Sequence, residues 1–387
     1  MGNFGATDID LTTKRLDSLL NESIVALSMI QIILSSLIPA FKVFQVPVEL
    51  TLLALLLVGC LTIKLDRWQI SLFFLLFIAT IFSLLTVDLI PSVTMGKNNI
   101  LGVLTLIYFS KVPFNSRLVV PVFITTTLLI SVNSFNSEIF YPLIELTYNT
   151  EFNLSRFGGV FFNAHFNAFF MGIFLIYFCQ LRYELGFIGL LPLYLTASST
   201  MIAAYLFQLA TILPVTKVLI NHSRKLNFII ILFAVVAAII FIVNYSSILD
   251  NLISENEANE NRYNSFIVIL VQLGEPKYYQ QLIQPFPVNY ALDSRAYSDY
   301  VPTVSGRLHS GENEIGFFSL FNQTGIFLGL ACLVTLMKKA RFYTVFILSS
   351  LIHYNFVLYP ISIYLVIEFS RRIQLIRDRR AYDLRNF

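Results

Sequence analysis

Long apolar runs separated by short polar stretches recur along the chain from Ser23 to Phe369. A helix needs about 20 residues to cross the hydrocarbon core of a bilayer, and most of these runs approach or exceed that length. The runs cover residues 23–44, 47–63, 68–90, 98–109, 118–132, 160–181, 185–197, 200–220, 226–245, 315–337 and 342–369. The pattern predicts an all-α, polytopic integral membrane protein.

The basic residues indicate how these runs are threaded through the bilayer, because Lys and Arg collect in cytoplasmic loops. The last run, residues 342–369, has basic residues on both flanks. Both flanks are therefore expected in the cytoplasm, which requires two short helices that turn near residues 353–355. The expected topology has about 12 membrane-spanning helices and two cytoplasmic termini, and it places 19 of the 26 Lys and Arg in the cytoplasm.

The composition agrees with a membrane protein and excludes an ordinary soluble one. Charged residues make up 13% of the chain and the mean hydropathy is +0.73, whereas soluble proteins carry roughly a quarter charged residues. No repeat or linker divides the sequence, so residues 1–387 are expected to form one membrane domain. The polar residues 1–22 lack a signal-peptide core, so the first helix is expected to remain as an anchor. The segments that start at residues 98, 118, 185 and 342 are too short to span alone, so they are expected to tilt little or to thin the bilayer around them.

Two loops on the outer side break the apolar pattern, a short one at residues 131–159 and a long one at residues 246–313. Positive-inside sorting should remove Arg from such loops. Four remain nevertheless, at Arg156, Arg262, Arg295 and Arg307. Arg forms planar, bidentate pairs with phosphate and carboxylate groups. Together these side chains indicate a site for an anionic group at the membrane surface; the alternative for each one alone is a solvated or salt-bridged loop residue.

The end of the long loop carries a polar cluster at the mouth of the next helix. The cluster contains His309, Glu312, Asn313 and Glu314, and the helix that follows contains Gly325 and Gly329. Because His titrates near neutral pH and can accept a proton from a hydroxyl group, His309 is the candidate general base. Carboxylates at a helix N-terminus are also ordinary caps, and this alternative stays open for Glu312 and Glu314.

A second polar segment, residues 154–167, leads from the short loop into a helix. Arg156 lies at its surface end, and Asn163, His165 and Asn167 fall just inside the apolar run. Polar residues within the membrane tend to be functional or to bond neighbouring helices. Asn163 and Asn167 share a helix face because they are four residues apart. Both substrate binding and helix-to-helix hydrogen bonding remain open for them.

These segments resemble the O-antigen polymerase and O-antigen ligase superfamily of bacterial polysaccharide assembly. In that superfamily an Arg-x-x-Gly-x-(aromatic)-x-x-x-Asn type of segment opens a central helix. An Arg near the start of a long periplasmic loop and a His-x-x-x-Asn segment at its end precede a helix that contains Gly. The matching residues here are Arg156, Gly159, His165, Asn167, Arg262, His309, Asn313, Gly325 and Gly329. The resemblance covers roughly residues 154–330, and it fails at residues 196–200, which read Thr-Ala-Ser-Ser-Thr where the family often has Thr-Gly-Ser-Arg.

The resemblance implies a GT-C-like glycosyltransferase of the bacterial inner membrane with an active site facing the periplasm. Its donor and acceptor would be undecaprenyl-pyrophosphate-linked oligosaccharides. A chain-length regulator is an open further partner, and no nucleic acid is expected. The implied catalytic residues are Arg156 and Arg262 for the leaving group and His309 as base, with Glu312 as second candidate. The implied substrate-binding residues are Arg295, Arg307, Asn167, His165 and Asn313. No Cys/His cluster marks a metal site, so the sequence requires no metal or other cofactor.

Two rival functions remain open. Ligation of the finished glycan to lipid A core or to a protein uses the same donor chemistry, and the sequence discriminates it poorly from polymerisation. The high Phe and Tyr content and the divergent residues 196–200 favour a polymerase, since such polymerases diverge with the repeat unit that they accept. A flippase or secondary transporter would carry charges along a pathway at mid-membrane, whereas here the charges gather in one external loop.

Overall fold

The computed structural model of this chain describes residues 4–37, 41, 43–86, 89–140, 159–182, 185, 188–196, 198–212, 316–351 and 357–383. All regular elements in these ranges are helices, as predicted. They are α1 (Phe4–Ser36), α3 (Gln45–Thr62), α4 (Arg67–Thr86), α5 (Leu89–Phe109), α6 (Val119–Phe135), η1 (Ser137–Phe140), α8 (Ala164–Leu181), α10 (Leu190–Leu195), α11 (Ser199–Ile212), α18 (Gly316–Lys339), η3 (Arg341–Tyr343), α19 (Thr344–Ser350) and α20 (Pro360–Asp383).

Several of these helices are suited to a bilayer. Among the described residues, three stretches are long and apolar enough to cross a membrane, namely Arg15–Ser36, Gln45–Thr62 and Ala164–Leu181. Outer helices also present apolar stripes at helical spacing, as α6 does with exposed Val120, Ile124, Leu128 and Val132. Exposed apolar surface of this extent marks contact with lipid or a partner. The described part of the chain therefore has the character of a membrane protein.

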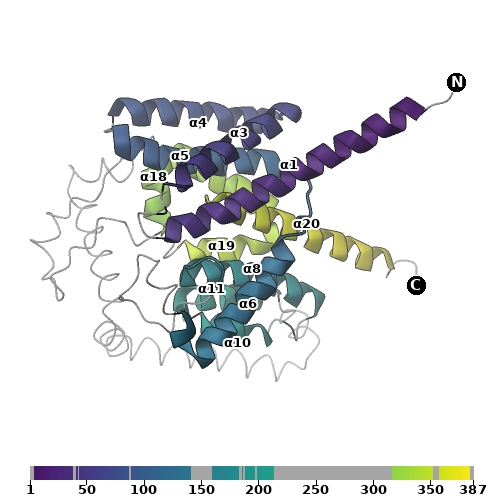
Figure 1. Ribbon diagram of the computed structural model, residues 1–387, viewed down its shortest axis with the longest axis vertical. Coiled ribbons are helices and arrows are strands. Elements are labelled where there is room, and N and C mark those ends of the chain that lie inside the picture. Colours follow the sequence, from purple (N-terminus) through teal and green to yellow (C-terminus); the bar gives the residue numbers. More distant parts are fainter. Residues whose placement is uncertain are drawn as a thin grey trace, which may run out of the picture.

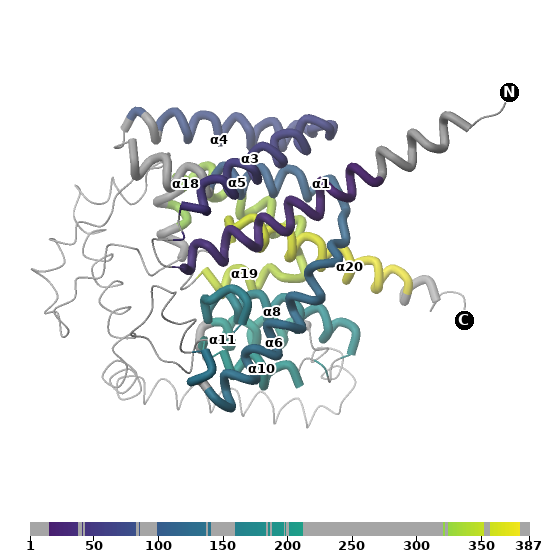
Figure 2. Tube along the Cα trace, in the orientation of Figure 1, coloured from purple at the N-terminus to yellow at the C-terminus, as the bar shows by residue number. Residues whose placement is uncertain are grey.

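The helices form two groups that meet along α20 (Figure 1). In the first group α3 and α4 pack with α5, α1 packs on α3, and α18 packs on α4 and α5; the second group contains α6, α8, α10, α11 and α19. α20 contacts α1 and α5 on one side and α8 on the other. Figure 2 shows α20 between the two groups.

α8 and α20 run side by side in the same direction. The Phe166 ring lies 6.2 Å from that of Tyr359, just before α20, and the Phe174 ring lies 4.7 Å from that of Phe369. Towards their other ends Arg377 Nη2 donates to Gln180 Oε1 at 2.9 Å. The start of α20 therefore lies beside the start of α8.

Two helices begin earlier than the apolar pattern predicts. α1 starts at Phe4, within the polar N-terminal stretch, because residues 6–36 contain neither Gly nor Pro to interrupt it. α5 starts at Leu89 and has 21 residues, so the expectation of a short helix over residues 98–109 is wrong. Pro91 is accommodated there because the first turn of a helix needs no N–H donor.

The last apolar run is divided into two helices, as expected, but only the first of them is short. α19 has only seven residues, and α20 begins at Pro360 and continues beyond residue 369 to Asp383. The expected turn at residues 353–355 lies outside the described residues. The same is true of the predicted helix at residues 226–245 and of the long loop at residues 246–313.

Candidate functional site

The start of α8 is the part of the predicted site that lies within the described residues. The chain turns sharply before this helix, with φ +103° at Gly159 and φ +50° at Phe162. Both angles belong to the left-handed region, which Gly adopts freely and Phe rarely. Such a conformation persists only where surrounding contacts hold it. Here those contacts come from Asn163 and Asn167.

Asn167 holds the turn from inside the protein. Its side chain is 1% exposed, and its Oδ1 accepts a hydrogen bond from the Phe161 backbone N–H at 3.3 Å. Gly159 lies directly on this amide, since a Cβ at that position would be 2.5 Å from Asn167 Cγ. Gly159 is thus required by close approach as well as by its positive φ. These contacts give Asn167 a positioning role, while its predicted contact with substrate stays a prediction.

Asn163 has a separate task at the same turn. Its backbone is extended, and its Oδ1 accepts from the Phe166 backbone N–H at 2.9 Å, so it is the N-cap of α8. α8 consequently begins at Ala164 rather than near residue 160. The two Asn residues that the sequence places on one helix face therefore act on different parts of one turn.

His165 lies next to a residue from a distant segment. Its Nδ1 is 2.9 Å from the hydroxyl oxygen of Ser198, which is buried between α10 and α11. The hydroxyl can donate to this nitrogen or accept from it, according to the tautomer. Ser198 belongs to residues 196–200, where the chain departs from the family pattern. The structure thus brings Ser198 to the start of α8.

Buried aromatic rings form a floor beneath the turn. The Phe161 ring lies 4.9 Å from that of Phe166 and 5.0 Å from that of Phe170, in edge-to-face geometry that aromatic pairs favour. Tyr359 reaches Phe166 from the segment before α20. Neither Ser198 nor Tyr359 was identified from the sequence, because no local motif marks a residue whose neighbour is far along the chain.

The other predicted site residues lie outside the described residues. They are Arg156, Arg262, Arg295, Arg307, His309, Glu312 and Asn313. Whether they meet at the start of α8 stays a prediction.

The two glycines of the predicted site helix each have a geometric reason. α18 is interrupted at Gly325, which has φ +73° and ψ 161°, so its backbone suits Gly alone among ordinary residues. At Gly329 a Cβ would lie 2.6 Å from Thr324 Oγ1 and 2.8 Å from Phe321 Cδ1. Gly325 therefore marks a break in α18, and Gly329 marks a close contact between the two sides of that break.

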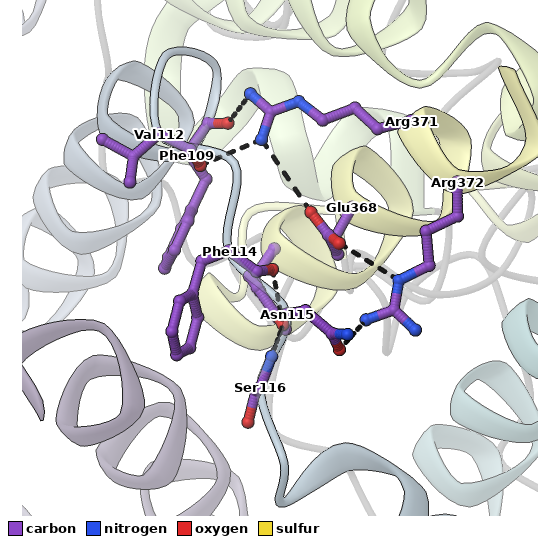
Figure 3. A network of polar contacts seen from close by, with 9 residues as sticks. Phe109, Val112, Phe114, Asn115, Ser116, Glu368, Arg371 and Arg372 are labelled. Atoms are coloured by element: carbon purple, nitrogen blue, oxygen red, sulfur yellow. Dashed lines mark hydrogen bonds and ion pairs between the residues drawn. The ribbon is translucent and has the colours of Figure 1, made fainter. Parts of the chain in front are cut away.

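The middle of α20 carries a charged network with a different purpose (Figure 3). Arg371 donates to the backbone carbonyls of Val112 at 2.9 Å and Phe109 at 2.5 Å. Carbonyls at the end of α5 have no partner within the helix, so Arg371 satisfies them. Glu368 accepts from Arg372 Nε at 3.1 Å and lies near Arg371. These cations hold the end of α5 against α20.

Comparison with protein family models, with curated proteins and with solved structures finds no match for this chain. A function is therefore inferred from the residues and from the geometry of the turn before α8.

Proposed function

We propose that this chain is a glycosyltransferase of the bacterial inner membrane that joins undecaprenyl-pyrophosphate-linked repeat units at the periplasmic face. The observation that carries the proposal is the closed turn at residues 159–163, which fixes the backbone three residues after Arg156. An Arg guanidinium close in sequence to such a turn can hold a pyrophosphate through bidentate hydrogen bonds. Since Asn163 and Asn167 are neutral, the positive charge of this segment comes from Arg156.

The proposed reaction is a single displacement. The acceptor hydroxyl attacks the anomeric carbon of the donor as the bond from that carbon to the pyrophosphate oxygen breaks, which inverts the configuration. The hydroxyl proton passes to the imidazole of His309, or to Glu312 as the second candidate. The departing pyrophosphate gains negative charge, which Arg156 and Arg262 stabilise with bidentate hydrogen bonds.

The described start of α8 contributes a polar rim over an apolar floor. His165 is partly exposed, and the buried Ser198 hydroxyl holds its ring. An imidazole positioned in this way is suited to hydrogen bonds with sugar hydroxyls. The rings of Phe161 and Phe166 below it exclude water and keep the rim rigid, which supports a role in substrate positioning.

The proposal is tested with purified protein and undecaprenyl-pyrophosphate-linked repeat units as the sole substrate. The expected product is a ladder of longer lipid-linked glycans, resolved by gel electrophoresis. Product that forms only after lipid A core is added would identify a ligase instead. Transfer of the unit across a vesicle membrane without a new glycosidic bond would identify a flippase.

Single substitutions then test the assigned roles. Arg156→Ala, Arg262→Ala and His309→Ala are each expected to abolish the ladder while the protein still inserts, because each removes a group that acts in the transition state. Arg295→Ala is expected to cause partial loss. Arg379→Ala is the matched control, since it removes an exposed cation near the far end of α20. A full ladder from any of the first three variants would show that its assigned role is wrong.

A further inference from the structure

Two neighbouring helices, α4 and α18, each present an exposed apolar stripe that ends in a cation. On α4 the stripe begins one turn after exposed Arg67 and comprises Ile70, Phe74, Phe77, Ile81 and Leu85. On α18 the stripe precedes exposed Lys338 by one turn and comprises Phe327, Leu330 and Val334. The two helices pack against each other. At 1.5 Å per residue the stripe on α4 is about 22 Å long and the one on α18 about 10 Å, and each has a positive charge at one end.

Both charged ends lie at the same corner of the protein. Lys339, the last residue of α18, places its Nζ 5.5 Å from the ring centroid of Trp68, in the first turn of α4. α4 and α18 are therefore antiparallel. Trp68 is the single Trp of the chain, and Trp is enriched at the level of lipid headgroups. The ring thus marks the height at which a headgroup would lie.

The corner carries more positive than negative charge. Lys111, in the loop after α5, forms an ion pair with Asp66 at 2.5 Å. Burial lowers the pKa of Lys339, and the positive charges of Arg371, Lys111 and Lys338 lower it further. Asp66 opposes this effect but is already paired with Lys111. An added anion at this corner would relieve the repulsion between these cations.

We propose that this corner binds the phosphate headgroup of an anionic phospholipid, whose acyl chains lie along the apolar stripes of α4 and α18. Arg67, Lys338 and Lys339 supply the charge, and Trp68 lies at the boundary between headgroup and chains. Lys and Arg near a membrane surface attract anionic lipids, and the stripes distinguish a lipid from a free phosphate ion. The site is independent of the glycosyltransferase proposal. It lies at the N-terminal end of α4, where Arg67 and Trp68 are.

The test compares the protein in nanodiscs of phosphatidylcholine with and without phosphatidylglycerol. Phosphatidylglycerol is expected to raise the thermal midpoint of the wild-type protein and to remain bound in native mass spectrometry. The triple variant R67Q/K338Q/K339Q should lose both effects. Each cation near a membrane surface contributes roughly a fivefold gain in affinity for anionic lipid, so the loss should be about a hundredfold.

A matched control separates a specific site from general surface charge. The variant R15Q/R182Q/R379Q removes three other exposed cations and should keep both effects. Equal loss in the two triple variants, or full retention in the first, would overturn the proposal. So would inorganic phosphate that reproduces the stabilisation in phosphatidylcholine alone. If the first triple variant does not fold, Lys338→Gln alone replaces it, because this exposed side chain supports no described contact, and a roughly fivefold loss is expected.

Discussion

Replacement of Gly159 by Ala is the sharpest test of the turn before α8. The methyl group would enter the space of the Asn167 side chain, lying 2.5–2.6 Å from its Cγ, Nδ2 and Oδ1 atoms. Asn167 would have to move, and the hydrogen bond from the Phe161 N–H would break. The same substitution would also place a Cβ on a backbone with φ +103°.

The expected loss of stability follows from these two effects. A left-handed backbone costs a residue with a Cβ about 1–2 kcal/mol. A buried N–H left without its acceptor costs about 1–3 kcal/mol. Gly159→Ala should therefore destabilise the protein by about 2–5 kcal/mol. The proposed glycan ladder should weaken with it, because the turn at the start of α8 is no longer held.

The cysteines of this chain provide the assay. Cys60, Cys179 and Cys332 are all free and buried, so a fluorogenic thiol reagent reacts with them only as the protein unfolds. The thermal midpoint of unfolding in detergent can then be measured from this reaction, with no added cysteine and no prior labelling. Gly159→Ala is expected to lower this midpoint by clearly more than Asn163→Ala, which removes an N-cap worth about 1 kcal/mol.

A double-mutant cycle decides whether the clash with Asn167 is the cause. In an Asn167→Ala background the space is empty, so only the backbone cost of Gly159→Ala remains, and its effect should fall to roughly half or less. An equal effect in both backgrounds would refute the reasoning. A midpoint unchanged by Gly159→Ala in the wild-type background would refute the geometry of the turn itself.

Two further substitutions test other contacts. Arg371→Ala leaves the carbonyls of Phe109 and Val112 without their donor. It should lower the free energy of unfolding by about 3 kcal/mol for the two charged hydrogen bonds, and lower the thermal midpoint with it. Arg371→Lys should not restore the midpoint, because one ammonium cannot replace a guanidinium fork, and full rescue by Lys would contradict this account. Ser198→Ala removes the hydroxyl that holds His165, so it should slow glycan synthesis several-fold while the thermal midpoint stays unchanged. Ser198→Thr keeps a hydroxyl and should retain the rate. Equal rates in the Ala and Thr variants would exclude the positioning role.

The apolar pattern predicted where helices lie better than where they begin. For α8 the predicted run 160–181 and the observed helix agree at the C-terminal end, because Arg182 ends both the apolar run and the helix. They differ at the start, where Asn163 caps the helix four residues later. Hydropathy measures the preference for lipid, and a helix begins where a side chain satisfies its free N–H groups.

The same distinction explains the early starts of α1 and α5. Polar residues continue a helix outside the bilayer as long as no breaker occurs, so α1 reaches back to Phe4. The break at Gly325 was also beyond prediction, although the Gly itself was noted. A Gly in a helix is usually tolerated at a small cost, and only the backbone angles show that this one interrupts α18.

For the candidate site, the sequence indicates which residues are unusual in their local segment, but it does not indicate which distant residues they contact. The polar residues at 163–167 were identified because they interrupt an apolar run. Their individual tasks depend on which atoms face Gly159, Phe161 and Ser198, and no spacing rule contains that information. The segment 196–200 was noted only for its departure from a family pattern, whereas its contact with His165 requires α10 and α11 to fold against α8.

Two parts of this bundle use different chemistry for the same structural task. In the middle of α20, Arg371 and Arg372 bond to backbone and side-chain oxygens, so their charge is used in holding helices together. At the start of α8 the amides of Asn163 and Asn167 accept from backbone N–H groups, and the hydroxyl of Ser198 bonds to His165. A site for a pyrophosphate needs cations that are not already committed to the fold. These contacts at the start of α8 use amides and a hydroxyl and commit no Arg, which is why we place the proposed transfer reaction there and assign the charged network around α20 to stability.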